Sequence, residues 1–240
     1  MKKVYSNVSK EKSMKKLFCI MVLMIASSLF ALDFARESEL QNDCDHNDGK
    51  ACLELGSMYH VGNGVTQSFS HARALYEQAC NLGVAKGCSS VGYMYENGHA
   101  GTDLAKATGF YERACVNGDA AGCGSLAVMY EDGKGVVEDM QKAVDYYDRA
   151  CSGGQSSSCA HLGLMYEQDG NMEYAVTYYQ NSCDAGGAAE CVRLATMYYT
   201  GGAVAQDEER ATQLFKRSCE LGDETGCKNY EKIKNSSYVQ

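Results

Sequence analysis

The chain has 240 residues, with 13 cysteines, 17 tyrosines, no proline or tryptophan, and a formal net charge of −9. Valine, isoleucine and threonine are too sparse for the alternating patterns of β-strands, so the composition predicts an all-α fold. An acidic chain repels phosphate backbones, which argues against nucleic acid as a partner.

The N-terminal residues carry an apolar run over residues 17–31, which follows a pair of lysines. A basic start, an apolar middle and small residues near the end are typical of an export signal. We therefore expect residues 1–31 to be removed together with Cys19, with Met14 as an alternative start; the run is short for a membrane span, although an anchor stays an alternative. The remaining chain has 16 basic and 30 acidic side chains, a net charge of −14.

The other twelve cysteines form six pairs, each with seven residues between its members. Three residues after the first cysteine stands a glycine, or an asparagine in the first pair, which is typical of the left-handed residue that closes a helix. Two helices joined by so short a turn run antiparallel, so their cysteines face each other and form disulfides in an oxidising compartment. The predicted disulfides are Cys44–Cys52, Cys80–Cys88, Cys115–Cys123, Cys151–Cys159, Cys183–Cys191 and Cys219–Cys227.

The sequence repeats when it is aligned on the second cysteine of each pair. Five full repeats, with a half-unit at each end, begin at Cys52, Cys88, Cys123, Cys159 and Cys191, in steps of 36, 35, 36 and 32 residues. Such periods predict an α/α solenoid, and we expect residues 32–240 to form a single one. The fourth repeat lacks four residues in the loop between its helices, which predicts a local change of curvature or a missing lip on one face.

Each repeat opens with its first helix, and Asp48, Asp119 and Asp223, directly after the left-handed residue of a turn, are candidates to cap the helix that follows them. Leucine or valine follows at offset 3 from the second cysteine, a small residue at offset 4, and Met-Tyr at offsets 6 and 7. Offsets 0, 3, 4 and 7 share one helical face, which we predict is packed. The second helix has another packed stripe. It consists of an alanine eight residues before the next cysteine and aromatic or leucine residues four and five residues before it. The regular period of the Met-Tyr pairs favours a core role over a ligand site.

The pattern Cys-x-x-Leu-Gly-x-Met-Tyr-x-x-Gly-x-Gly-Val, followed by Ala-x-x-Tyr-Tyr-x-x-Ala-Cys, resembles the Sel1-like repeat, a relative of the tetratricopeptide repeat. With its paired cysteines, the chain is similar over residues 34–234 to the Helicobacter cysteine-rich proteins, a family of secreted, disulfide-bridged solenoids. The fourth repeat departs from the pattern because it lacks Gly-x-Gly-Val. The resemblance implies an enzymatic alternative, since members of that family have been described as penicillin-binding proteins with β-lactamase activity, the hydrolysis of the β-lactam amide.

Catalytic motifs do not support that alternative. Ser-x-x-Lys, which serine β-lactamases need, occurs only within residues 9–16, and Lys-Thr-Gly is absent. Seven intervening residues fit neither zinc-binding nor thioredoxin-like cysteine pairs. We expect no metal and no cofactor, and the catalytic residues of any enzymatic activity stay unassigned. The histidines are scattered, without a zinc motif: His46, His60, His71, His99 and His161.

The outward face of the first helices is where the repeats differ, and repeat proteins place their binding surfaces at such positions. Three glutamates at offset 8 form an acidic row, which is either a solvated face or a groove for a basic or polar peptide with apolar contacts beside it. We predict an exported, monomeric scaffold, secreted or periplasmic, that binds a protein or peptide, with a peptidoglycan fragment or a β-lactam as alternative ligands. The candidate binding residues are Tyr93, Glu96, Glu131, His161, Leu164, Glu167, Arg193 and Tyr199.

Overall fold

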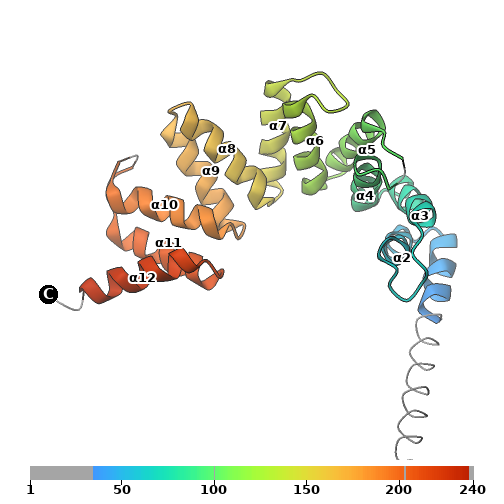
Figure 1. Cartoon of the computed structure of the whole chain (residues 1–240), viewed down its shortest axis with the longest axis horizontal. Coiled ribbons are helices and arrows are strands. Elements are labelled where there is room, and N and C mark those ends of the chain that lie inside the picture. Colours follow the sequence, from blue (N-terminus) through green and yellow to red (C-terminus); the bar gives the residue numbers. More distant parts are fainter. Residues whose placement is uncertain (1–34, 100, 203, 238–240) are drawn as a thin grey trace, which may run out of the picture. The chain divides into compact units, whose positions relative to one another are not determined.

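The computed structural model describes residues 35–99, 101–202 and 204–237, in which the chain forms α-helices joined by turns and loops, and no strand (Figure 1). The predicted export signal, residues 1–31 with Cys19, lies outside the described residues. Within the described ranges, no helix has both the length and the apolar character that crossing a membrane requires.

The chain divides into two compact units, and the first, Met1–Val84, contains one complete repeat. A helix over residues 35–45 precedes the hairpin of the first full repeat. The core of this unit joins Cys44 and Cys52 to Leu55 of the first helix and Leu75 of the second. The helices of the hairpin are α2 (Gly49–Val61) and α3 (Phe69–Asn81).

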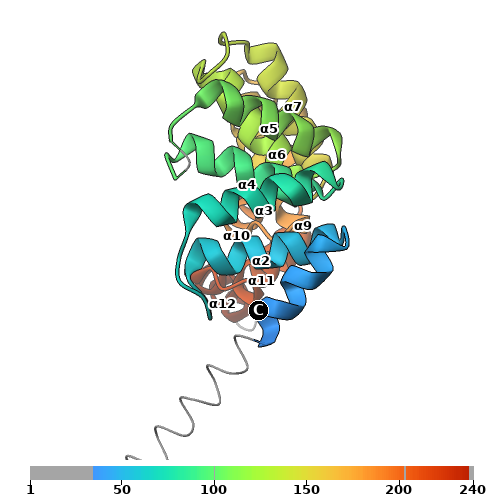
Figure 2. The same ribbon diagram turned by 90° about the vertical axis from the view of Figure 1, so that its right-hand side faces the viewer.

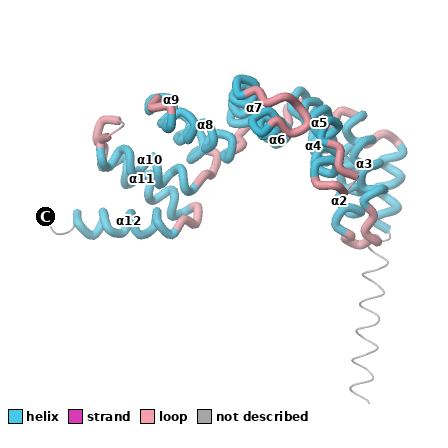
Figure 3. The backbone as a smooth tube through the Cα atoms, turned by 45° about the horizontal axis from the view of Figure 1, so that its top comes forward, coloured by secondary structure: helices cyan, strands magenta, loops and turns pink. Residues whose placement is uncertain are grey.

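The second unit, Ala85–Gln240, contains four helical hairpins and a last helix that packs against the hairpin before it. Each hairpin contacts the next mainly through consecutive helices, as for α5 and α6 (Figure 2). Short loops separate the helices (Figure 3). The helices are α4 (Ala85–Glu96), α5 (Leu104–Val116), α6 (Ala120–Asp132), α7 (Met140–Ser152), α8 (Ser156–Gln168), α9 (Met172–Asp184), α10 (Ala188–Thr200), α11 (Glu208–Glu220) and α12 (Glu224–Ser237).

The faces that the periodicity predicts as packed are buried. The second cysteine, the leucine or valine at offset 3 and the small residue at offset 4 are buried in every repeat, and the alanine of each second helix is fully buried. Glycine at offset 4 permits a close approach, because a Cβ on Gly163 would lie 2.5 Å from a ring carbon of Tyr179. The tyrosine at offset 7 is less uniform than predicted: Tyr95 and Tyr198 are buried, whereas the other three are half-buried.

The turns between repeats follow the expected chemistry. The closing residue is left-handed at Asn47, with φ 69°, and at the equivalent glycines, such as Gly118 with φ 90°. The side chains of Asp48, Asp119 and Asp223 accept hydrogen bonds from backbone N–H groups in the first turn of the following helix. Each turn therefore ends one helix and starts the next without a longer connection.

Five of the six predicted disulfides are formed in the described residues, one at each of five turns. Cys80 and Cys88 are also disulfide-bonded. These two cysteines belong to different units, so their pairing stays a prediction. The five disulfides are Cys44–Cys52, Cys115–Cys123, Cys151–Cys159, Cys183–Cys191 and Cys219–Cys227.

The four residues missing from the fourth repeat are absent from the loop inside its hairpin, as predicted. Residues 133–139 connect α6 to α7, whereas residues 169–171 suffice between α8 and α9. The longer loop lies against the start of the preceding second helix, because a Cβ on Gly135 would meet the carbonyl oxygen of Leu104 at 2.5 Å. Met140, which starts α7 as Leu104 starts α5, is 44% exposed.

Candidate binding site

The predicted binding residues all lie on first helices of the second unit. Tyr93, Leu164 and Tyr199 are exposed, and so is Val128, which has the same offset in its repeat as Tyr93 and Leu164. The three glutamates are half-buried, which a fully solvated face would not produce. Helix α4 carries Tyr93 and Glu96, α6 carries Glu131, α8 carries His161, Leu164 and Glu167, and α10 carries Arg193 and Tyr199.

Each glutamate of the acidic row accepts a hydrogen bond from a tyrosine on the second helix of its own hairpin. Tyr111 donates to Glu96 over 2.6 Å, Tyr147 donates to Glu131 over 2.5 Å, and Tyr179 donates to Glu167. Burial, and then the bonded carboxylate, raises the pKa of each of these tyrosines above its ordinary value. The tyrosines therefore stay protonated and hold the carboxylates in fixed positions.

Two of the glutamates also bind a side chain of the next first helix. His161 Nε2 lies 2.9 Å from Glu131 Oε1, and Arg193 donates to Glu167 over 2.9 Å. The position equivalent to His161 and Arg193 that follows Glu96 is Ser125, which carries no charge. The acidic row is thus a set of tyrosine–glutamate pairs, each within one hairpin. The pairs of Glu131 and Glu167 also contact the next repeat, whereas Glu96 has a neutral residue at this position.

A cavity of about 260 Å³ opens on this face between α6, α7 and the start of α8. The rings of Tyr147 and His161 form one wall, with centroids 4.4 Å apart. The polar groups of the cavity are mainly hydroxyls and an amide, so it fits a small neutral polar group. Its lining residues are Gly124, Ser125, Val128, Tyr147, Gln155, Ser157, Ser158 and His161.

The polar contacts of the cavity favour binding over nucleophilic catalysis. An activated serine needs a hydrogen bond to a base that a third group orients. Ser158 Oγ instead donates to Gln155 Oε1 over 2.7 Å, and His161 Nε2 contacts Glu131. In the described part of the chain, no hydrogen bond joins His161 to a serine.

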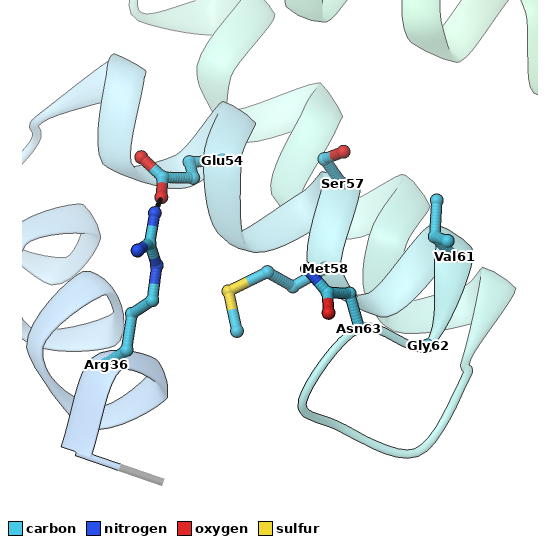
Figure 4. A pocket seen from close by; sticks show the side chains of 7 residues that line it. All are labelled: Arg36, Glu54, Ser57, Met58, Val61, Gly62 and Asn63. Atoms are coloured by element: carbon cyan, nitrogen blue, oxygen red, sulfur yellow. Dashed lines mark hydrogen bonds and ion pairs between the residues drawn. The ribbon is translucent and has the colours of Figure 1, made fainter. Parts of the chain in front are cut away.

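The first unit has a larger hollow on the equivalent face of α2, with a volume of about 560 Å³ (Figure 4). Arg36, from the preceding helix, reaches across it to form an ion pair with Glu54. Sequence reasoning did not identify Arg36, because the half-unit that carries it has no repeat partner for comparison. The lining residues are Arg36, Glu54, Ser57, Met58, Val61, Gly62 and Asn63.

A second structural feature, which the sequence analysis missed, is a layered stack of side chains along one edge of the α4–α5, α6–α7 and α8–α9 hairpins. In the α6–α7 hairpin, Lys142 Nζ lies 5.0 Å from the centroid of Tyr130, which stacks on Tyr146 at 5.6 Å. Arg149 covers Tyr146 at 5.8 Å. The α4–α5 hairpin has the same order, with Lys106, Tyr95, Phe110 and Arg113. The sequence signal is a cation three residues after the aspartate that caps the second helix.

A profile of the Sel1 repeat matches five consecutive segments of the chain, residues 49–84, 85–119, 120–155, 156–187 and 191–223. The first four segments begin with α2, α4, α6 and α8, so one matched segment corresponds to one helical hairpin. A comparison with curated protein sequences found no match.

Among solved structures, the chain is similar to a Sel1 repeat protein from Oxalobacter formigenes, with 25% identity and a TM-score of 0.66 over 76% of this chain and 77% of that one. A protective antigen of uropathogenic Escherichia coli that displays an SLR fold is 25% identical, with a TM-score of 0.67 over 84% of this chain and 52% of the antigen. The chain thus spans about half the length of that antigen. Helicobacter pylori cysteine rich protein B is 31% identical, with a TM-score of 0.43 over 52% of this chain and 96% of that protein.

Proposed function

Because the chain belongs to the Sel1 repeat family, we propose that it is an exported scaffold that binds an extended peptide segment of a protein partner. Sel1 repeats generally mediate protein interactions. The segment would lie along the outward face of α4, α6, α8 and α10. Exposed apolar side chains would anchor it, and the half-buried glutamates would accept hydrogen bonds from its polar or basic groups.

The observation that carries this proposal is the exposed apolar row beside the fixed glutamates. Tyr93, Val128 and Leu164 occupy the same offset on three successive first helices, and all three are exposed. Apolar side chains at regular intervals suit an extended peptide, whose alternate side chains point to the same side. The tyrosine–glutamate pairs lower the entropic cost of binding, because the carboxylates are already ordered.

The cavity between α6 and α8 supplies a subsite along the same face. Its rim includes Val128 of the apolar row, and its wall includes His161, which contacts Glu131. A small polar side chain of the peptide, such as serine, threonine or asparagine, would find hydroxyl and amide partners there. The subsite therefore contributes selectivity, and the apolar row contributes most of the affinity.

The disulfides support an oxidising, non-cytoplasmic compartment, because paired cysteines stay reduced in the cytosol. We assign the protein to the periplasm or to secretion and expect it to act as a monomer. The predicted signal at residues 1–31 is the motivation for export, and mass spectrometry of the protein recovered outside the cytoplasm tests its removal.

The binding face is tested by selecting short peptides from a random display library on the disulfide-intact protein. We expect the double variant Tyr93→Ala, Leu164→Ala to bind the selected peptides about tenfold more weakly, since two exposed anchors are lost. The matched control, Val116→Ala with Val137→Ala, removes apolar side chains that are exposed elsewhere on the second unit. Equal binding by the two double variants would contradict the proposal, and nitrocefin hydrolysis by the same protein would favour the enzymatic alternative.

A further inference from the structure

The α8–α9 hairpin lacks both cations of the layered stack. Tyr174 stands where Lys106 and Lys142 stand in the two preceding hairpins, three residues after the cap of the second helix. Its ring lies 5.1 Å from Tyr166, which stacks on Tyr178 at 5.4 Å with an interplanar angle of 1°. The stack of this hairpin therefore consists of three tyrosine rings, and Tyr174 is 52% exposed.

The second cation is replaced by Asn181. Arg113 and Arg149, two residues before their cysteines, cover the last ring of the two preceding stacks, at 5.5 Å from Phe110 and 5.8 Å from Tyr146. Asn181, at the same position before Cys183, is exposed, and its side chain is shorter and carries no charge. Within the part of the chain that the structure describes, no cation therefore covers the face of Tyr178 that corresponds to the arginine position.

A carboxylate adjoins the same ring. Tyr178 donates a hydrogen bond to Asp148 Oδ1 of α7 over 2.8 Å. Among the described residues, Asp148 forms no salt bridge. In the preceding hairpin, Glu112 lies near Tyr146 as Asp148 lies near Tyr178, but there Arg149 supplies a positive charge. The α8–α9 hairpin thus combines an aromatic surface with a carboxylate that forms no salt bridge within the described ranges.

We propose that the tyrosine stack of α8 and α9, with Asp148 beside Tyr178, is a second binding site, which takes up an arginine or lysine side chain of a protein partner. The cation would occupy the position that Arg113 and Arg149 fill in the preceding hairpins. It would contact the ring of Tyr178 and the Asp148 carboxylate together, which combines a cation–π contact with an ion pair. Tyr166 of this site belongs to the first helix α8, but the groups that would contact the cation, Tyr178 and Asp148, belong to second helices, so the site does not depend on the outward face of the first helices.

Two changes of sequence, at Tyr174 and Asn181, converge on the same hairpin. The short connection at residues 169–171 is not a third, because the α6–α7 connection lies against Leu104 at the start of the preceding second helix. By the same geometry, the shorter connection uncovers the start of α7, where Met140 is exposed, and leaves the tyrosine stack unaffected. The stacks of the α4–α5 and α6–α7 hairpins indicate the chemistry of the ligand, because in each of them an arginine of the same chain covers the last ring.

The experiment is a titration of the disulfide-intact protein with N-acetyl-arginine methylamide, followed through the ring-proton NMR signals of the tyrosines. The neutral isostere N-acetyl-citrulline methylamide serves as the ligand control. We expect arginine to shift the signals of Tyr178 saturably and citrulline to leave them unchanged. In the variant Asn181→Arg, which supplies an internal guanidinium, the Kd for the arginine probe should rise about two- to fivefold, the range of an exposed cation–π contact.

The matched control variant is Gln213→Arg, which adds the same charge on exposed surface of α11 and should leave the titration unchanged. Shifts of equal size at Tyr146 and Tyr178 would overturn the proposal, because they would indicate general attraction to an acidic protein. An unchanged Kd in Asn181→Arg would also overturn it, and so would saturable shifts with N-acetylglucosamine but not with arginine, which would indicate a carbohydrate site. The double variant Tyr93→Ala, Leu164→Ala should bind the arginine probe with unchanged Kd. The proposed peptide site on the first helices can therefore prove wrong without affecting the test of the tyrosine stack.

Discussion

The α6–α7 and α8–α9 hairpins share one fold but differ in how many of their polar and aromatic side chains find a partner within the hairpin. In the α6–α7 hairpin both helices begin with an aspartate whose side chain caps the helix, Asp119 and Asp139. In the α8–α9 hairpin the corresponding residues are Gln155 and Asn171, and neither makes a side-chain cap hydrogen bond. A missing cap costs about 1 kcal/mol, so the second of these hairpins is expected to be the less stable one.

The comparison shows that a repeat can lose local stabilisation while its core stays intact. Ala143 and Ala175 are both fully buried, and Tyr147 and Tyr179 both bind a glutamate of their own hairpin. What changes is the periphery, where caps, loop length and cations differ. Groups that satisfy each other in the α6–α7 hairpin are left available in the α8–α9 hairpin, and these are the groups that a partner can use.

Removing the disulfide before α8 should have the largest effect on this comparison. The double variant Cys151→Ser, Cys159→Ser opens a loop of about nine residues, which the chain-entropy account equates with about 2.5 kcal/mol. Because Gln155 provides no side-chain cap at this turn, we expect faster hydrogen exchange over residues 140–185, with residues 85–115 still protected.

The matched variant is Cys115→Ser, Cys123→Ser, at the turn that Asp119 caps. It opens a loop of the same length, but Asp119 still caps α6. We therefore expect it to loosen its own junction less than the first variant does. Uniform loss of protection along the second unit in either variant would show that the hairpins unfold together, and the difference between capped and uncapped turns would then have no consequence.

A methyl group at Gly163 should have the next largest effect. Alanine already occupies the equivalent position in α6, at Ala127, whereas a Cβ on Gly163 would lie within 2.6 Å of two ring carbons of the fully buried Tyr179. We expect Gly163→Ala to lower stability by about 2 kcal/mol through overpacking, measured as a lower Tm under non-reducing conditions. Ala127→Gly, the reverse change, should cost about 1 kcal/mol through helix propensity, and more through the loss of a fully buried methyl group. An unchanged Tm in Gly163→Ala would mean that α8 can move away from α9 without penalty.

The smallest expected effect is that of the tyrosine hydroxyl at the acidic row. Tyr147→Phe removes the hydrogen bond to the half-buried Glu131 and should cost about 1 kcal/mol at neutral pH. Burial and Glu131 raise the pKa of Tyr147 above its ordinary 10.0, so its contribution to stability is complete below pH 10 and declines as the pH rises above 10. Urea unfolding as a function of pH should therefore show a smaller alkaline loss in Tyr147→Phe than in the wild type.

Tyr179→Phe provides the comparison in the α8–α9 hairpin. Arg193 lies near Tyr179 and opposes the effect of burial and Glu167 on the pKa of this tyrosine. The alkaline change caused by Tyr179→Phe should accordingly be smaller than the change caused by Tyr147→Phe. The reverse order would indicate that Arg193 does not compensate the charge of Glu167.

Periodicity was sufficient to predict the fold. Apolar and small residues recur at offsets 0, 3 and 4, and such positions must lie on one helical face, whatever the rest of the chain does. Glycine or asparagine after the first cysteine predicted the left-handed turns, because few other residues adopt positive φ without strain. The Asp48, Asp119 and Asp223 caps followed from the same local rules.

The partners of the polar side chains depended on the tertiary structure. The sequence placed Glu131 and Glu167 on an outward row, but it did not reveal that Tyr147 and Tyr179 donate to them, because these contacts join residues on two helices. His161 and Arg193 were predicted only as members of the binding face, and the structure adds that each pairs with a glutamate of the preceding repeat.

The sequence by itself determined which helical positions are packed, which residues form the turns, and which cysteines lie across each turn, because these properties depend on neighbours within about ten positions. Only the tertiary structure decided which of the repeated side chains form hydrogen bonds, ion pairs or ring contacts with one another. The tyrosine stack at Tyr174, Tyr166 and Tyr178 illustrates this, since its open faces follow from two separate departures from the repeat pattern, at Tyr174 and Asn181. Each departure is unremarkable along the chain, and they act together because folding brings them to one edge of one hairpin.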